Sequence, residues 1–312
     1  MSAEATETTG PGGSGQGGSF VPVGTVGAVE SGPALTLWSD AWRRLRKNRL
    51  ALVGGGLIIV MVLIALLAPI IATHDPVKQS LSEARQGPSL HHFFGTNVLG
   101  QDMYSRMVYG ARISLSIGVL ATLLSIVAGV ALGAIAGYFA GWSESIIMRL
   151  ADIFFAFPYV LGAIVIVTAV GRSFASIFIA IGILGWATVA RLFRSSVLSV
   201  KGTEYVDAAR AIGAGDWRII TRHILPNAFA PVLVYGTMSI GGAILAESAL
   251  SFLGLGVRPP TPAWGSMVAD GIQFIETVPW LVIFPGMFIV LTVLGFVLLG
   301  DGLRDSLDPR LR

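Results

Sequence analysis

Two carboxylic acids, Asp152 and Glu247, lie inside long apolar stretches of the chain. An ionised carboxylate costs roughly 2.5–3.5 kcal/mol at the centre of a membrane helix, so each acid needs a partner or a wet cavity. Arg149 stands at i−3 from Asp152 and offers a local ion pair. Glu247 has no base nearby, so a translocation path or its outer gate and a buried, protonated, hydrogen-bonded structural role both stay open. Pro158, in the stretch that holds Asp152, is expected to bend its helix and to help shape a cavity.

Metal and thiol chemistry have little support in the sequence. The chain has no cysteine, and two of its four histidines, His91 and His92, are adjacent. No third ligand stands at a recognisable spacing from this pair. The sequence therefore favours an exposed polar loop here and predicts no metal site and no cofactor.

Catalysis by the chain itself is also disfavoured. A phosphate-binding loop of the form GxxxxGK[ST] would indicate ATP hydrolysis, but the lysines follow Arg46, Val77 and Val200 rather than glycine. An intramembrane protease would need paired acids, or a Ser and a His, at matching depths. Asp152 and Glu247 are expected at different depths, so an enzyme is not predicted, and any ATP hydrolysis must occur on a partner.

The composition indicates that the elements holding these residues are membrane helices. Hydrophobic residues make up 54% of the 312 residues and charged residues 12%, whereas soluble domains carry about 25% charged residues. We therefore expect an all-α polytopic protein whose helices cross about 30 Å of hydrocarbon. Six spans are predicted, near residues 51–72, 113–138, 146–170, 174–190, 229–256 and 281–300.

Charge predicts the orientation of these spans. Five basic residues between positions 43 and 49 place the N-terminus in the cytoplasm by the positive-inside rule. Six more in the loop 191–228 place that loop on the same side, and six crossings return the C-terminus there. The outer, periplasmic loop 73–112 carries four basic residues, which is a mild conflict. The expected location is a bacterial cytoplasmic membrane.

The N-terminal part is expected to precede the membrane domain. Residues 1–34 are rich in Gly, Ser, Thr and Pro and predict a disordered cytoplasmic tail. Residues 35–50 predict a cytoplasmic amphipathic helix, which Asp40 can cap. The transmembrane domain then covers residues 51–312.

Small residues recur at every fourth position of the second span, at Gly129, Gly133 and Gly137. This spacing lets helix backbones approach closely in lipid. Ordinary packing between spans is the commoner cause of the pattern, and a specific dimer face is the alternative.

The loop between spans four and five predicts a helix at the membrane surface. Thr203 is the expected N-cap, and Glu204 in the first turn suits the helix dipole. One small apolar face follows at i, i+3, i+4 and i+7, formed by Tyr205, Ala208, Ala209 and Ile212. Gly213 and Gly215 are expected to end the helix by supplying positive φ.

A second short helix is expected in the same loop. Asp216 would cap its start and Pro226 would end it. Together the two helices predict a compact, alanine-centred knob that fits a groove on another protein.

This loop resembles the EAA loop of ABC importer permeases, in which EAA precedes three residues, a glycine, nine more residues and I-x-L-P. The matching positions here are Asp207, Ala208, Ala209, Gly213, Leu225 and Pro226. Asp207 replaces the Glu of the pattern, and His223 replaces its Ile. The resemblance implies that residues 207–213, with Glu204 one turn earlier, form the coupling helix that inserts into a cytoplasmic ATPase.

Further stretches are similar to peptide-permease C subunits: FGTNVLGQDMYSRMVYGARISL, ILAESALSFLGLGV, PPTPAWGSMV and GDGLRDSLDPRL. The resemblance covers about residues 35–312 and implies a type I ABC importer permease fold. It further implies import of dipeptides, oligopeptides or nickel chelates by alternating access. The implied partners are a homologous B-type permease subunit, ATPase subunits that bind ATP and Mg, an extracytoplasmic substrate-binding protein and membrane lipid, with no nucleic acid.

A secondary transporter or channel is the alternative. It should show repeated half-chains or interrupted spans that carry ion ligands. The sequence shows neither feature, and the EAA-like loop would have no purpose in such a protein.

Overall fold

The computed structural model describes residues 42–307, which belong to one compact unit. The tail 1–34, Asp40 and residues 308–312 lie outside the described residues. Of the predicted helix 35–50, residues 42–45 are helical before a short turn. Within the described part the regular secondary structure is helical, apart from one isolated antiparallel β-bridge between Thr96 and Asp102.

Five helices of the described part are long and apolar enough to cross a membrane. They are α2 (Arg49–Leu66), α4 (Met103–Phe139), α7 (Phe174–Lys201), α11 (Ala230–Phe252) and α13 (Trp280–Leu307). The pair α5 (Gly141–Ala156) and α6 (Tyr159–Val170), which are bent by 91°, meets the same criteria when taken together and makes a sixth span, the third along the chain, if it is counted as one. The all-α, polytopic prediction is confirmed.

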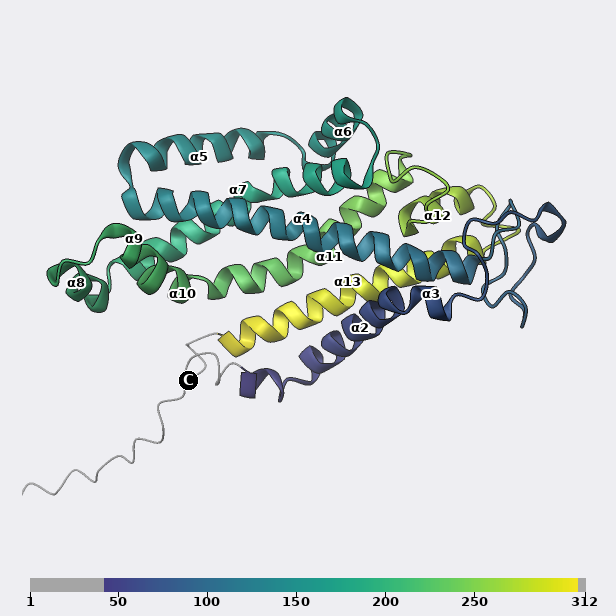
Figure 1. Cartoon of the computed structure of the whole chain (residues 1–312), viewed down its shortest axis with the longest axis horizontal. Helices are drawn as coiled ribbons and strands as arrows, with labels where there is room; N and C mark the ends of the chain where they lie inside the picture. The colour runs from purple at the N-terminus through teal and green to yellow at the C-terminus, as the bar shows by residue number, and fades with distance from the viewer. Residues whose placement is uncertain (1–41, 308–312) are drawn as a thin grey trace, which may run out of the picture. The chain divides into compact units, whose positions relative to one another are not determined.

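The break in the third span falls at Pro158. The preceding Phe157 is extended, with φ −95° and ψ 132°, as steric clash with a following proline requires. Pro158 also lacks the N–H that would continue the helix. The predicted bend is therefore a full interruption, and α6 turns across the end of α5 (Figure 1).

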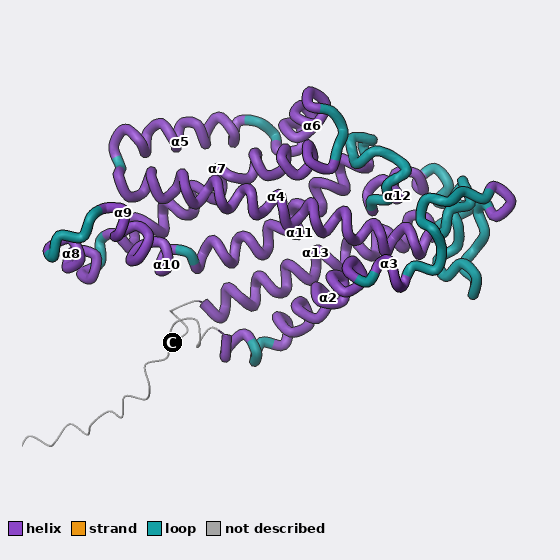
Figure 2. Tube along the Cα trace, viewed as in Figure 1, coloured by secondary structure: helices purple, strands orange, loops and turns teal. Residues whose placement is uncertain are grey.

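Short elements lie at the two ends of the bundle (Figures 1 and 2). At one end, beside the start of α2 and the end of α13, are α8 (Glu204–Ala211), α9 (Asp216–Ile219), the π-helical turn η2 (Ile220–Ile224) and α10 (Leu225–Ala228). At the other end are α3 (Ala68–Ile71), η1 (Leu81–Glu83) and α12 (Trp264–Ile272). Most of the loop chain lies at this second end.

The second span is longer than its apolar stretch suggests, because α4 begins at Met103 rather than near residue 113. Asp102 caps it by accepting the Ser105 backbone N–H at 2.8 Å. Met107 on this added length is fully buried. Its carbonyl accepts a hydrogen bond at 3.0 Å from the indole of Trp264, which is also fully buried.

The glycines of α4 pack against α7. A Cβ atom on Gly129 would lie 2.5 Å from Cβ of Val189, and one on Gly133 would lie 2.6 Å from the carbonyl oxygen of Ala190. Such contacts leave no room for a side chain. The repeat therefore serves packing between two spans of this chain.

Gly133→Leu is expected to lower the free energy of unfolding by about 1–3 kcal/mol or more, because the added side chain overpacks the α4–α7 contact. Thermal unfolding of the purified protein measures the effect. Gly56→Leu is the matched control, since a Cβ at Gly56 meets no atom within 4 Å. Equal melting temperatures for the two variants would contradict this packing.

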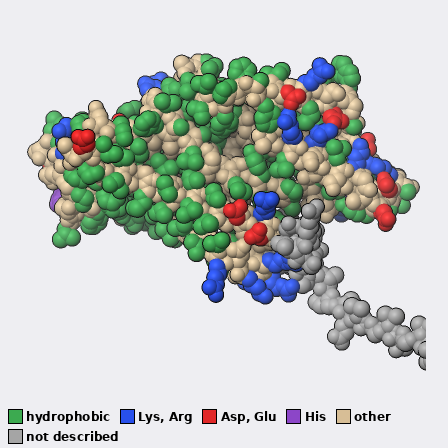
Figure 3. All heavy atoms as spheres, turned by 180° about the vertical axis from the view of Figure 1, so that it is seen from behind, with side chains coloured by type: hydrophobic (Ala, Val, Ile, Leu, Met, Phe, Trp, Pro, Cys, Tyr) green, Lys and Arg blue, Asp and Glu red, His purple; other side chains and the backbone are tan. Residues whose placement is uncertain are grey.

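The outer surface suits lipid. Figure 3 shows apolar side chains over the flank of the helices, with charged side chains gathered toward the ends. Ile59 and Val60 on α2 and Val165 on α6 are more than half exposed. An apolar flank of this extent is expected of a bundle that is surrounded by hydrocarbon.

Candidate functional site

The predicted coupling segment forms α8, which begins at Glu204 and projects from the end of the bundle (Figure 1). Thr203 has the extended backbone of an N-cap, but its hydroxyl donates to the Val200 carbonyl at 2.6 Å and does not cap the helix. Gly213 has φ +82° and follows the helix end as predicted. The expectation for Gly215 is wrong, since its φ is −68°.

The predicted apolar face of α8 divides into two. Ala209 is 5% exposed and packs inward beside the fully buried Val206. Ala208 and Ile212 point outward, and Ile212 is 86% exposed. The outward side also carries Asp207, whose carboxylate accepts a hydrogen bond from Arg210 at 3.0 Å. A small apolar surface with charged neighbours is thus available to a partner.

The second half of the loop differs from its prediction. Gly215 occupies the cap position, and Asp216 is the first residue of α9. Pro226 does not end the helical run, because it lies in the first turn of α10, just after Leu225. The run reaches Ala228 through the π-helical turn η2, and α11 begins at Ala230.

Tyr138, near the end of α4, attaches this loop to the membrane helices. Its hydroxyl donates to the Asp216 carboxylate at 2.6 Å, and its carbonyl accepts from Lys201 at 2.5 Å. Its ring belongs to a buried apolar cluster that joins the loop to α4 and α7 and includes Phe193, Val197, Val206, Ile219, Ile220 and Ile224. These contacts connect α8 and α9 to the ends of α4 and α7.

Glu247 lies in the middle of the helix packing rather than on an open surface. Its side chain on α11 is 0% exposed. Its carboxyl oxygens accept hydrogen bonds from the hydroxyls of Ser114 at 3.0 Å, Ser251 at 2.6 Å and Ser248 at 3.5 Å. This geometry favours the structural interpretation and links α11 to α4.

Glu247→Ala is expected to cost about 1–3 kcal/mol of stability, because it leaves buried serine hydroxyls without their acceptor. Glu247→Gln should lose much less, since its amide oxygen still accepts. Melting temperatures of the purified variants test this. If the alanine variant has the melting temperature of the wild type but has lost uptake, Glu247 acts in transport rather than in packing.

Asp152 also has a structural partner. Its carboxylate pairs with Arg191 of α7 at 2.5 Å, not with the local Arg149 that the sequence suggests. The guanidinium of Arg191 also lies over the ring of Phe155. A second pair, Arg194 with Glu144, joins the same two helices. Asp152 and Glu144 of α5 thus each form an ion pair with an arginine of α7.

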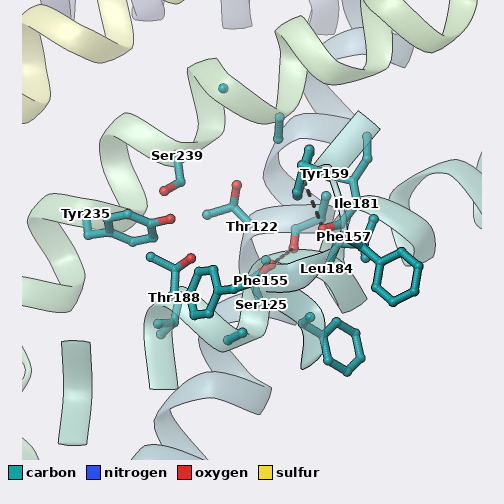
Figure 4. Close-up of a pocket in the computed structure, with 17 residues that line it drawn as sticks. Thr122, Ser125, Phe155, Phe157, Tyr159, Ile181, Leu184, Thr188, Tyr235 and Ser239 are labelled. Carbon is teal, nitrogen blue, oxygen red and sulfur yellow. Dashed lines mark hydrogen bonds between the residues drawn. The ribbon is translucent and has the colours of Figure 1, made fainter. Parts of the chain in front are cut away.

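A cavity of about 440 Å³ lies between α4, α5, α6, α7 and α11. Figure 4 shows hydroxyl groups of Thr122, Thr188, Tyr235 and Ser239 around it, with Phe155 and Tyr159 in its wall. Thr122 is 6% exposed, and its buried hydroxyl has no hydrogen-bond partner within the described chain. Among residues 42–307, which the structure describes, no charged side chain lines the cavity.

The sequence-based candidates do not line this cavity. Asp152 and Glu247 lie outside it, while Pro158 stands between two lining residues, Phe157 and Tyr159. The lining hydroxyls were missed because single Ser, Thr and Tyr residues are common in membrane helices. The hydroxyls of Thr122, Thr188, Tyr235 and Ser239 come from three separate helices, so their spacing along the chain gives no signal.

Comparisons with known proteins agree with this architecture. Residues 129–312 match the family described as "Binding-protein-dependent transport system inner membrane component", and residues 36–88 match the "N-terminal TM domain of oligopeptide transport permease C". A solved structure of the MetNI methionine ABC transporter superposes with a TM-score of 0.54 at 16% identity, covering 65% of this chain and 97% of that chain.

Curated relatives are similar over most of their length. The dipeptide transport system permease protein DppC of Alkalihalophilus pseudofirmus is 46% identical, over 89% of this chain and 92% of its own. The oligopeptide transport system permease protein OppC of Bacillus subtilis is 43% identical, over 89% and 92%. The glutathione transport system permease protein GsiD of Pectobacterium atrosepticum is 39% identical, over 92% and 96%. The chain therefore belongs to the family of binding-protein-dependent transport system inner membrane components, the permease subunits of ABC importers.

Proposed function

We propose that this subunit forms half of a channel that imports dipeptides or oligopeptides, driven by ATP hydrolysis on partner subunits that dock on α8. The observation that carries the proposal is the outward face of α8, where Ile212 is 86% exposed. The inward side of α8 is joined to α4 through the buried cluster that contains Val206 and Tyr138. A partner that pushes α8 moves the helices that line the cavity.

Peptides as substrates are supported by the names of the relatives and by the cavity. Relatives 46% and 43% identical carry the names of dipeptide and oligopeptide permeases. Hydroxyls such as those of Thr122, Tyr235 and Ser239 can hydrogen-bond to a peptide backbone whatever its side chains. The side chains of the described residues that line the cavity are apolar or carry hydroxyl groups, which suits a substrate class of varied sequence.

The orientation follows from the same assignment. Docking of a cytoplasmic ATPase on α8 places that end of the bundle, with the start of α2 and the end of α13, in the cytoplasm. Basic residues at positions 43–49 agree with this side. The segment between α3 and α4 and helix α12 then face the extracytoplasmic binding protein, and a B-type permease completes the channel.

Reconstituted transport tests the proposal. Proteoliposomes that contain this chain, its permease partner and the ATPase subunits are loaded with ATP and Mg²⁺ and given the binding protein and labelled peptides outside. Uptake of peptides but not of single amino acids, dependent on ATP, supports it. Equal uptake without ATP would favour a secondary transporter, and ATP-dependent uptake of another solute alone would contradict the peptide assignment.

A further inference from the structure

Three of the four histidines of the chain come together at the end of the bundle opposite α8. His74 follows α3, and His91 and His92 lie in the loop before α4. Their ring centroids are 4.6–4.9 Å apart. One possible ligand nitrogen from each lies within 4.8 Å of the others. The third ligand that the sequence spacing did not reveal is thus supplied by the segment that leaves the first span.

The ring of His92 has a fixed orientation. Its side chain is 3% exposed, and its Nδ1 lies 2.9 Å from Oδ1 of Asp102. A carboxylate oxygen can accept a hydrogen bond from Nδ1, which leaves Nε2 as the nitrogen that faces away from Asp102 and can bind a metal ion. That Nε2 lies 3.2 Å from Nδ1 of His91. Two nitrogens bound to one tetrahedral metal ion at about 2.0–2.1 Å are about 3.3 Å apart, so this pair has nearly the spacing of co-ligands.

Asp102 is itself held in place. Its Oδ2 accepts the backbone N–H of Ser105 at 2.8 Å. The Ser105 hydroxyl in turn accepts the backbone N–H of His74 at 3.0 Å. A carboxylate that orients a histidine through the nitrogen opposite the metal is a common feature of zinc sites.

We infer that His74, His91 and His92 bind one Zn²⁺ ion, and that Asp102 is the positioning residue for His92. Three imidazoles with a fourth position open to water suit Zn²⁺, and the chain has no cysteine that would supply a thiolate. His91 is exposed, so the ion enters from solvent. The side chain of His74 is 33% exposed and can rotate to close the longer nitrogen distances. The ion ties the segment after α3 to the loop that precedes α4.

The test is a Zn²⁺ titration against a competing chelator on the purified importer complex, with an affinity tag that contains no histidine. The wild type is expected to bind one Zn²⁺ per copy of this chain. His74→Ala and His91→Ala should each weaken binding by about tenfold or more. His223→Ala is the matched control, because the fourth histidine lies in η2 at the opposite end of the bundle, and it should bind as the wild type does.

Asp102→Asn separates positioning from folding. Its side-chain oxygen still accepts the Ser105 N–H, so α4 keeps its cap and the metal-free melting temperature should not change. Zn²⁺ affinity should nevertheless fall by about 10–100-fold. The inference is independent of the transported substrate. It is overturned if the His74→Ala/His91→Ala double variant binds Zn²⁺ with the stoichiometry and affinity of the wild type.

Discussion

Ile212→Asp is expected to weaken binding of the ATPase subunits by about 30-fold and to abolish coupled uptake. Burial of a central apolar side chain in an interface is worth about 2 kcal/mol or more, which corresponds to that change in affinity. An unpaired carboxylate in the same place adds a desolvation cost. Since Ile212 is 86% exposed in the chain alone, the substitution should leave the folding of the subunit intact. Pull-down of the ATPase subunits and uptake by proteoliposomes measure the two effects.

The control for this experiment is Leu81→Asp. Leu81 is 73% exposed and lies in η1 at the opposite end of the bundle. The Leu81→Asp variant should bind the ATPase subunits as tightly as the wild type does. Ala209→Arg is a poor test, because Ala209 is 5% exposed and the substitution would disrupt the packing of the loop itself. If the Ile212→Asp variant binds the ATPase subunits as tightly as the wild type does, α8 is not part of the docking surface.

Gly242→Trp is expected to reduce uptake by about tenfold or more while assembly with the ATPase subunits persists. Gly242 lines the cavity, and a Cβ placed on it meets no atom within 4 Å. An indole there fills space needed by a solute without overpacking the helices. Initial rates of labelled peptide uptake give the measurement, with ATP hydrolysis recorded on the same samples.

Gly56→Trp is the matched control for the cavity. Gly56 lies on α2 and also has open space around its Cβ position, but it does not line the cavity. Its variant should transport at the wild-type rate. If Gly242→Trp transports as well as Gly56→Trp does, the cavity between α4 and α11 is not on the path of the substrate.

Local chemistry was predictable where it depends on the backbone or on composition. The spans follow from apolar length, and the break at Pro158 follows from the missing N–H of proline. Gly213 has the positive φ expected after the end of α8. Such features are encoded within a few neighbouring residues, so a single sequence is enough to find them.

Tertiary partners were not predictable in the same way. Asp152 pairs with Arg191 on another helix although Arg149 is nearer in sequence. Asp216 binds the hydroxyl of Tyr138 instead of capping its own helix. His74 approaches His91 and His92 only because the loop between α3 and α4 folds back on itself. In each case the spatial partner is distant along the chain, and no periodic pattern in the sequence predicts the contact.

Site-directed photo-crosslinking tests directly whether a cytoplasmic ATPase docks on α8. The natural chain has no cysteine, so a maleimide–benzophenone probe attaches only at an introduced thiol, here in Ile212→Cys or in the control Leu81→Cys. Irradiation of the assembled importer should join the ATPase subunit to the Ile212→Cys variant and not to the Leu81→Cys variant. No ATPase adduct from position 212, or an equal adduct from position 81, would show that α8 is not the docking surface.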